Sequence, residues 1–210
     1  MFAWGASGYD HGAVCYQPWS TELVDTLYNA YGDPNYDLRD GTGQADWGYN
    51  AITNGGNQTG FWHTLTMDEW SYVFNTRNTA SGIRYAKAIV NNVKGMLLLP
   101  DDWNATNYSL YNVNSSSCHY SDNVISISDW SIMEAQGVVF LPSAGSRYVE
   151  LISGYSQPNS STSYGQYWSA THYDYDGAYF VRFNNTSMVT TYNQIRYMGQ
   201  SVRVVCPVNR

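Results

Sequence analysis

Short apolar runs along the chain predict two helices. Residues 66–69 (Thr-Met-Asp-Glu) have the capping-box pattern, in which a hydroxyl accepts from the amide three residues on and a glutamate reaches back. The box opens a short helix in which the apolar side chains of residues 70, 73 and 74 share one face. The second predicted helix covers residues 128–135, with Ser128 as its N-cap and Gly137 as its stop.

Strand patterns surround these helices. Residues 83–90 and 96–99 flank residues 91–95, which predicts a hairpin with one of the longer loops. Further strands are predicted at residues 138–141, 166–170, 178–184 and 201–206. Two short helices, mostly antiparallel short strands and long loops indicate an α+β fold class.

The first sixty residues carry repeated turn signals, with tryptophans spaced between them. Buried indoles such as those of Trp4, Trp19 and Trp47 can anchor loops that lack regular hydrogen bonding, so we expect ordered loops here. No internal repeat is visible at a solenoid period. A chain of 210 residues is therefore predicted to form a single domain over residues 1–210.

Composition narrows the possible partners. Aromatic residues make up 16% and charged residues 13%, against roughly 25% charged in an average globular protein, so the chain is expected to fold. The net charge is −7, and the ten Lys and Arg form no cluster, which argues against nucleic acid as a partner. The longest apolar runs fall far short of the roughly 20 residues of a membrane-spanning helix.

The three cysteines, Cys15, Cys118 and Cys206, are widely spaced. They suit neither a disulfide framework nor a metal knuckle, and at most one bridge is possible. Because Cys206 lies in the apolar run of residues 202–208, we predict a buried thiol there.

Catalytic patterns are lacking. The sequence has no nucleophile elbow, no zinc-protease helix motif, no phosphate loop and no dinucleotide fingerprint, and its four histidines stand singly. We therefore predict that the protein is not an enzyme and has no cofactor. Asp101–Asp102 and Asp174–Asp176 could each supply only a fragment of a calcium site, which needs six to eight oxygens, and turn formation explains Asp101–Asp102 equally well, so no metal is predicted.

Residues 164–197 hold seven of the twenty tyrosines, together with Asn, Ser, Thr, Asp and His. This mixture is typical of antibody binding loops, where tyrosine gives rigid contact area and small polar residues give adaptable hydrogen bonds. Polar loops with some buried rings remain the alternative. In residues 178–184, alternation places Tyr179, Val181 and Phe183 on a predicted core face. The opposite face, with Phe180, Arg182 and Asn184, is predicted to be an exposed binding stripe.

Motifs throughout the chain resemble those of the variable proteins of diversity-generating retroelements from Bacteroidetes and their phages. The motifs that carry the resemblance are Trp4-Gly5-Ala6-Ser7-Gly8-Tyr9, Gln17-Pro18-Trp19-Ser20, Asp46-Trp47-Gly48, Asn54-Gly55-Gly56-Asn57, residues 65–77, Gly82-Ile83-Arg84-Tyr85-Ala86, residues 98–103, residues 140–145, Tyr167-Trp168-Ser169 and residues 201–207. The resemblance implies a C-type lectin fold of the formylglycine-generating-enzyme-like branch.

In that family, adenine-directed mutagenesis rewrites a C-terminal segment while a framework is kept. The resemblance therefore implies a variable region over residues 164–206, with kept positions that include Trp168, Val181, Phe183 and Arg196. The positions implied to vary and to bind ligand, all within reach of an AAC codon, are Thr171, His172, Tyr173, Asp174, Tyr175, Asp176, Phe180, Arg182, Asn184, Asn185, Thr191, Tyr192, Asn193, Ile195 and Tyr197.

The expected function is non-catalytic recognition of a macromolecular ligand, either a protein or a surface glycan, by a protein displayed on a cell or virion surface. Calcium-dependent sugar binding is not expected, because no Trp-Asn-Asp strand follows the Gln-Pro-Asn of residues 157–159. The oxidising activity of the branch is not expected either, because only Cys206 lies near the C-terminus. The alternative is a structural domain of a fimbrial or tail assembly, with the tyrosine-rich face as a fixed subunit contact.

Overall fold

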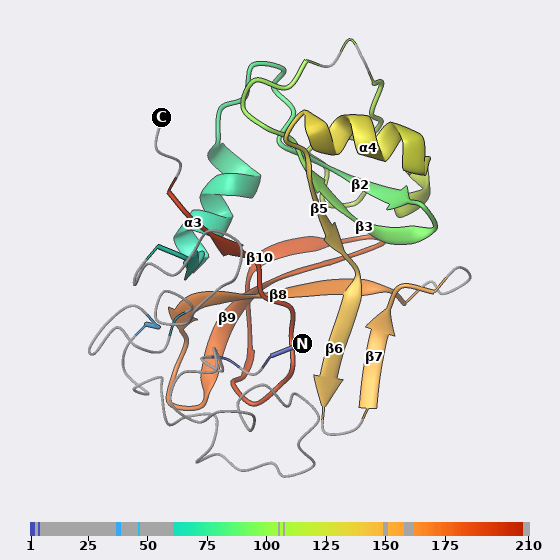
Figure 1. The fold of residues 1–210 in the computed structure, drawn as a ribbon. Coiled ribbons are helices and arrows are strands. Elements are labelled where there is room, and N and C mark those ends of the chain that lie inside the picture. Colours follow the sequence, from blue (N-terminus) through green and yellow to red (C-terminus); the bar gives the residue numbers. More distant parts are fainter. Residues whose placement is uncertain are drawn as a thin grey trace.

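A computed structural model describes residues 1, 2, 4, 37, 38, 46, 61–104, 106, 108–148, 151–157 and 162–207, and shows a mixed α and β architecture (Figure 1). The predicted α+β class is confirmed. In chain order the elements are β1 (His63–Thr64), α3 (Met67–Ser71), the π-helical turn η2 (Tyr72–Thr76), β2 (Tyr85–Val90), β3 (Val93–Leu98), the 3-10 turn η3 (Tyr120–Asp122), β4 (Val124–Ile125), α4 (Ile127–Ala135), β5 (Val139–Pro142), β6 (Ala144–Tyr148), β7 (Leu151–Tyr155), β8 (Tyr164–His172), β9 (Gly177–Asn184), β10 (Met188–Ile195) and β11 (Val204–Val205).

The described strands form three sheets. A four-stranded sheet has the order β4-β2-β3-β5, a five-stranded sheet has the order β10-β9-β8-β6-β7, and β1 pairs with β11. The pairs β2–β4 and β6–β8 are parallel and the others are antiparallel. The prediction of mostly antiparallel strands is therefore confirmed. Figure 1 shows α4 on the four-stranded sheet, and β5 continuing into β6, so that one stretch of chain joins the two larger sheets.

The five-stranded sheet is buried on both faces near its centre. On one face Tyr167, Val181 and Phe183 pack with Trp70 and Phe74 of the helical segment α3–η2. The side chains on the other face pack in a cluster made of Trp4, Leu38, Trp168, Ala170, Ala178 and Phe180. Two layers of core therefore hold β8 and β9.

The first predicted helix start is confirmed. Thr66 Oγ1 accepts from Glu69 N at 3.1 Å, and Glu69 Oε2 accepts from Thr66 N at 2.7 Å. The second helix ends as predicted, because Gly137 takes φ +89°. The prediction that Ser128 is the N-cap of this helix is wrong. Ser126 is the cap, because its hydroxyl stands three residues before Asp129 and accepts from Asp129 N at 3.1 Å.

The hairpin β2–β3 has a shorter loop than predicted. Only Asn91 and Asn92 connect the strands, with φ of 45° and 65°. Two successive residues with positive φ form the tight turn that matches the twist of antiparallel strands, and asparagine tolerates this conformation. The residues that follow, Val93 to Gly95, consequently belong to β3 rather than to a loop.

Other differences concern strands and thiols. The strands β1, β4, β6, β7 and β10 were not predicted, and the strand predicted at residues 201–206 is reduced to β11. Cys118 is buried, but Cys206 is only partly buried, contrary to prediction, and both are free thiols.

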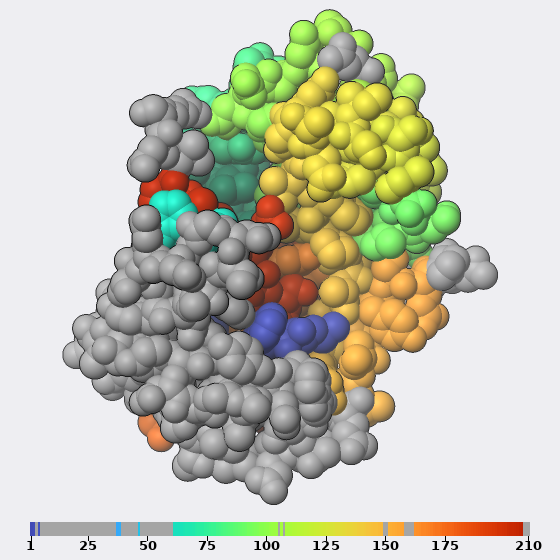
Figure 2. Space-filling model, in the orientation of Figure 1, coloured from blue at the N-terminus to red at the C-terminus, as the bar shows by residue number. Residues whose placement is uncertain are grey.

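Most of the predicted N-terminal loops lie outside the described residues, as do Cys15, Trp19 and Trp47. Trp4 is buried, and its Nε1 donates to the Ser169 carbonyl at 2.7 Å. Phe2 N donates to the Gln200 carbonyl at 2.7 Å, and Figure 2 shows the first residues, in blue, beside the C-terminal part of the chain, in red. In the described part of the chain, no helix has the length and apolarity needed to cross a membrane.

Candidate functional site

The turn between β8 and β9 presents side chains to solvent. Tyr173 is 47% exposed and Tyr175 is 74% exposed, and Asp174 and Asp176 are exposed as well. Tyr173 N donates to the Gly177 carbonyl at 3.0 Å, and Asp174 Oδ1 accepts from Gly177 N at 2.7 Å. Backbone contacts and one carboxylate therefore close the turn without using the Tyr175 ring.

The buried side chain of Arg196 holds the backbone of this turn through hydrogen bonds. Its Nε donates to the Gly177 carbonyl at 3.1 Å and its Nη2 donates to the Asp174 carbonyl at 2.8 Å, while its guanidinium lies 4.4 Å from the Trp4 ring centroid. Arg196 N also donates to the Asp176 carbonyl at 2.8 Å. These acceptors are all backbone carbonyls, so Arg196 can make these contacts whatever side chains the turn carries, and only the Asp174 carboxylate adds a side-chain contact from the turn itself.

Strand β10 forms one edge of the sheet next to this turn and exposes Thr191, Tyr192 and Asn193. Its register against β9 shifts between Val189 and Tyr192, which marks a bulge. Asn193 lies opposite Tyr179, whose ring meets the Tyr173 ring edge-on at 5.2 Å. The turn and the edge strand thus form a continuous surface, which we call the turn–edge surface: Tyr173, Asp174, Tyr175, Asp176, Tyr179, Thr191 and Asn193.

Arg182 lies on the other face of β9, with Tyr164 and Tyr192. Its guanidinium carbon is 5.1 Å from the Tyr164 ring centroid and 5.3 Å from the Tyr192 ring centroid. Both distances fall within the range of cation–π contacts. Arg182 and Tyr164 are partly buried, whereas Tyr192 is 44% exposed.

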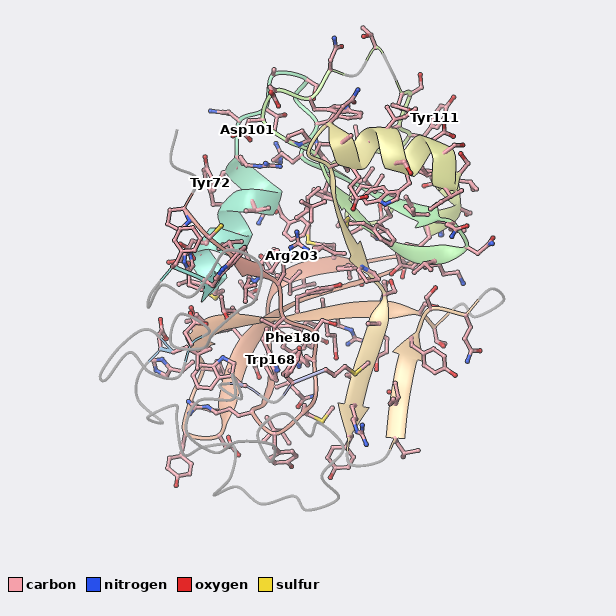
Figure 3. All side chains as sticks on the ribbon, viewed as in Figure 1. Tyr72, Asp101, Tyr111, Trp168, Phe180 and Arg203 are labelled. Atoms are coloured by element: carbon pink, nitrogen blue, oxygen red, sulfur yellow. The ribbon has the colours of Figure 1, made fainter. Side chains whose placement is uncertain are left out.

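Phe180 was predicted to be an exposed member of the binding stripe, and this prediction is wrong. Phe180 is 1% exposed and its ring packs edge-on against Trp168 at 5.7 Å (Figure 3). Alternation correctly separated its face from that of Val181 and Phe183, but Trp4 and Leu38 contribute to a second core on the Phe180 face. Arg182 and Asn184, further along the same face, remain partly exposed.

Several other candidate positions are used inside the protein. Thr171 Oγ1 accepts from Met67 N at 3.0 Å, and His172 Nδ1 lies 2.8 Å from Asp37 Oδ1. Asn184 Oδ1 accepts from Thr186 N at 2.8 Å and so closes the β9–β10 turn. These roles are structural.

The remaining candidates lie at the two ends of β9. Asn185 Oδ1 accepts from Tyr120 N at 3.0 Å, at the end away from the β8–β9 turn. Ile195 and Tyr197 are partly buried near the turn, and the Tyr197 ring lies 6.2 Å from that of Tyr148. The structure therefore does not bring all the candidate residues into one patch.

Sequence reasoning missed two contributors. Tyr164 holds Arg182, and Tyr179 supports Tyr173, yet the first was not singled out and the second was assigned to the core. A signal existed for Tyr179, because a tyrosine at the end of a core-facing series can leave its ring partly exposed next to a turn.

A separate cavity of about 380 Å³ lies beside α3. Trp62, Trp70, Val139 and Val205 are among its apolar lining residues, and Arg77, Arg203 and Cys206 also line it. Among its lining residues in the described part of the chain there is no histidine and no carboxylate. The described residues likewise contain no group of three or more His, Cys, Asp or Glu arranged to hold a metal ion.

Comparison with known proteins finds no matching family model and no significant match to a curated protein or to a solved structure.

Proposed function

We propose that the protein binds a macromolecular ligand without catalysis, through the turn–edge surface and through Arg182 on the other face of β9. The observation that carries this proposal is the separation between exposed side chains and buried support. Tyr175 is 74% exposed, whereas Arg196, which holds its turn, is 1% exposed. Exposed tyrosines, aspartates and an asparagine at a rigid turn have the composition of a protein-binding surface.

We further propose that this surface varies between copies of the protein and that the scaffold is a C-type lectin fold, as the resemblance to retroelement variable proteins implies. Support comes from the turn itself, since the Arg196 guanidinium donates to the main-chain carbonyls of Asp174 and Gly177, and Tyr173 N donates to the Gly177 carbonyl. Exposed substitutions usually change stability by only about 0.5 kcal/mol. A changed ligand would thus not require a changed fold. Display on a cell or virion surface belongs to the same proposal.

Two displayed libraries test the proposal. One randomises Tyr173, Tyr175, Asp176, Thr191 and Asn193, and the matched library randomises five buried residues of the strands that flank the turn, β8 and β9: Trp168, Ala178, Phe180, Val181 and Phe183. We expect most clones of the first library to keep protease resistance and to yield binders against unrelated protein targets, and most clones of the second to lose resistance. Equal losses in the two libraries would refute the proposal.

Sequencing sibling genes tests the same proposal at another level. We expect substitutions to concentrate at the exposed positions, and a near-copy of the C-terminal coding segment that differs at adenines to lie beside a reverse transcriptase gene. Evenly spread differences without such a copy would contradict diversification.

One observation favours a second candidate function, a subunit of a fimbrial or tail assembly. Edge strand β7 carries no charged residue and exposes Leu151 (73%), Ile152 (48%) and Tyr155 (45%). Edge strands that lack charge and proline can pair with another chain. Concentration-dependent association that Leu151→Lys abolishes would support this candidate over the first.

A further inference from the structure

Arg182 is held in place by aromatic rings rather than by hydrogen bonds. Tyr164 lies opposite Asn184, and Tyr192 lies opposite Phe180, so the two tyrosines flank Arg182 diagonally on one face of the sheet. The guanidinium contacts both rings, at 5.1 and 5.3 Å from their centroids. A guanidinium packed on aromatic rings loses much of its freedom while its N–H groups stay unused.

Three other partly or fully buried arginines of the described residues have acceptors. Arg84 Nε donates to the Phe74 carbonyl at 2.8 Å, Arg77 pairs with Asp101 at 3.0 Å, and Arg196 donates to two carbonyls. Arg182 makes no hydrogen bond or ion pair with any described residue, and its Nε is buried without an acceptor. This is notable in a chain with seventeen acidic and ten basic residues. Arg182 is partly exposed, so part of its side chain is open to solvent and to a ligand.

The two rings differ in how much free surface they offer: Tyr164 is closely covered, whereas Tyr192 is 44% exposed. The Tyr164 ring lies against Gly154 so closely that a Cβ there would collide with it, and Arg182 lies over the ring as well. The Tyr192 ring packs against Phe180 at 5.6 Å and against Arg182. A sugar ring that needed an open aromatic face would find the Tyr164 ring covered and only part of the Tyr192 ring open. The charged group left to make a specific contact is the guanidinium.

We propose that Arg182 binds one carboxylate, supplied by an aspartate or glutamate side chain of a protein ligand. A planar guanidinium matches a carboxylate through paired N–H donors, and charge-assisted hydrogen bonds are the stronger kind. Arg182 offers one positive charge, and the net charge of the chain is −7, so a polyanion would be repelled by the rest of the protein. A ligand group with one negative charge, such as a carboxylate, therefore suits this site better. This inference rests on the proposed function and adds the chemical nature of the ligand.

The test uses the full chain with ¹⁵N-labelled arginine and follows the guanidinium resonances by NMR. The probes are N-acetyl-glutamate methylamide, its glutamine counterpart, methyl glucuronide and inorganic phosphate. We expect saturable shifts of the Arg182 signals with the glutamate probe and at least about tenfold weaker binding of the glutamine probe. Because Arg182→Lys has no Arg182 signal, binding to that variant is followed by saturation transfer to the probe protons, and an equal loss is expected there. Arg203→Lys is the matched control, because Arg203 is exposed and contacts no ring in the described part of the chain.

Each outcome decides the inference. Selective binding of the glutamate probe, lost in Arg182→Lys and kept in Arg203→Lys with both variants folded by circular dichroism, supports it. Tighter binding of methyl glucuronide would overturn it in favour of an acidic sugar. Equally tight binding of phosphate would overturn the inference, because Arg182 would then bind anions in general rather than carboxylates. Absence of any saturable shift would refute carboxylate binding. The library result is independent of all four, so failure here leaves the proposed function to be judged separately.

Discussion

Replacing Lys87 with methionine is predicted to remove a pH-dependent cost from the fold. Lys87 lies in β2, fully buried, and its Nζ donates to the carbonyls of Ser116 at 2.7 Å and Cys118 at 3.0 Å. Burial lowers the pKa of this amine from 10.5 to about 8. Since one pKa unit is worth about 1.4 kcal/mol, the buried charge costs about 3 kcal/mol at neutral pH.

The pH window follows from the lowered pKa. Above pH 10.5 the amine is neutral in both states, and its ionisation costs the fold nothing. As the pH falls from 10.5 toward 8, the unfolded chain gains a proton that the folded chain does not, so the free energy of unfolding decreases. Between pH 9.5 and 7.5 this decrease amounts to about 2 kcal/mol. Burial raises the pKa of Tyr120 and of Tyr167, which reduces stability only above about pH 10.

Urea denaturation of the wild type and of Lys87→Met at pH 7.5, 8.5 and 9.5 measures this effect. We expect the free energy of unfolding of the variant minus that of the wild type to be about 2 kcal/mol larger at pH 7.5 than at pH 9.5, because the variant lacks the buried charge. Two lost hydrogen bonds, about 1 kcal/mol each, offset part of the gain at every pH. Lys94→Met, on the neighbouring strand, is the control. A difference between Lys87→Met and wild type that stays constant with pH would refute the reasoning.

Three further substitutions test the packing, the helix cap and a strained turn. Trp168→Ala is expected to cost about 3–5 kcal/mol in thermal denaturation, because the indole is buried, whereas Tyr175→Ala should stay within about 0.5 kcal/mol. Similar losses would show that the turn holds the fold. Thr66→Ala should cost about 1 kcal/mol in urea denaturation, and Thr66→Ser should restore it, unless the cap contributes nothing. Gly145→Ala should cost about 2 kcal/mol or more in melting experiments, because φ is +74° and the added Cβ would meet the Ser153 carbonyl; an unchanged melting temperature would contradict this.

Local signals predicted the elements whose ends depend on nearby residues. Thr66 and Glu69 determine the start of α3 through contacts only three residues apart, so the sequence suffices there. The prediction of the second N-cap failed because Ser126 and Ser128 are the same residue type and both suit a cap. Their spacing from Asp129 along the chain decides between them, since the cap hydroxyl accepts from the amide three residues on. The predicted length of the β2–β3 loop was wrong because Asn91 and Asn92 were not recognised as a tight turn.

Long-range packing explains the rest. The alternation in β9 correctly separated Val181 from Phe180, but alternation does not tell how many faces of a sheet are covered. Phe180 is buried because Trp4 and Leu38, distant in sequence, belong to the same cluster. Likewise β10 resembled a polar loop, since its apolar residues are few, and only pairing with β9 reveals a strand. Within the candidate site, the exposure of Tyr173 and Tyr175 was foreseen, whereas the clamp of Tyr164 on Arg182 was not.

The dependence of the β8–β9 turn on Arg196 has a genetic consequence. If adenines in the coding segment are rewritten at each round, an arginine encoded by AGA or AGG would be lost in many daughters, and with it the fixed shape of the turn. A CGC or CGT triplet contains no adenine and would pass through every round intact. The gene is therefore expected to use such a triplet at position 196, while the codon for Tyr175 remains open to change.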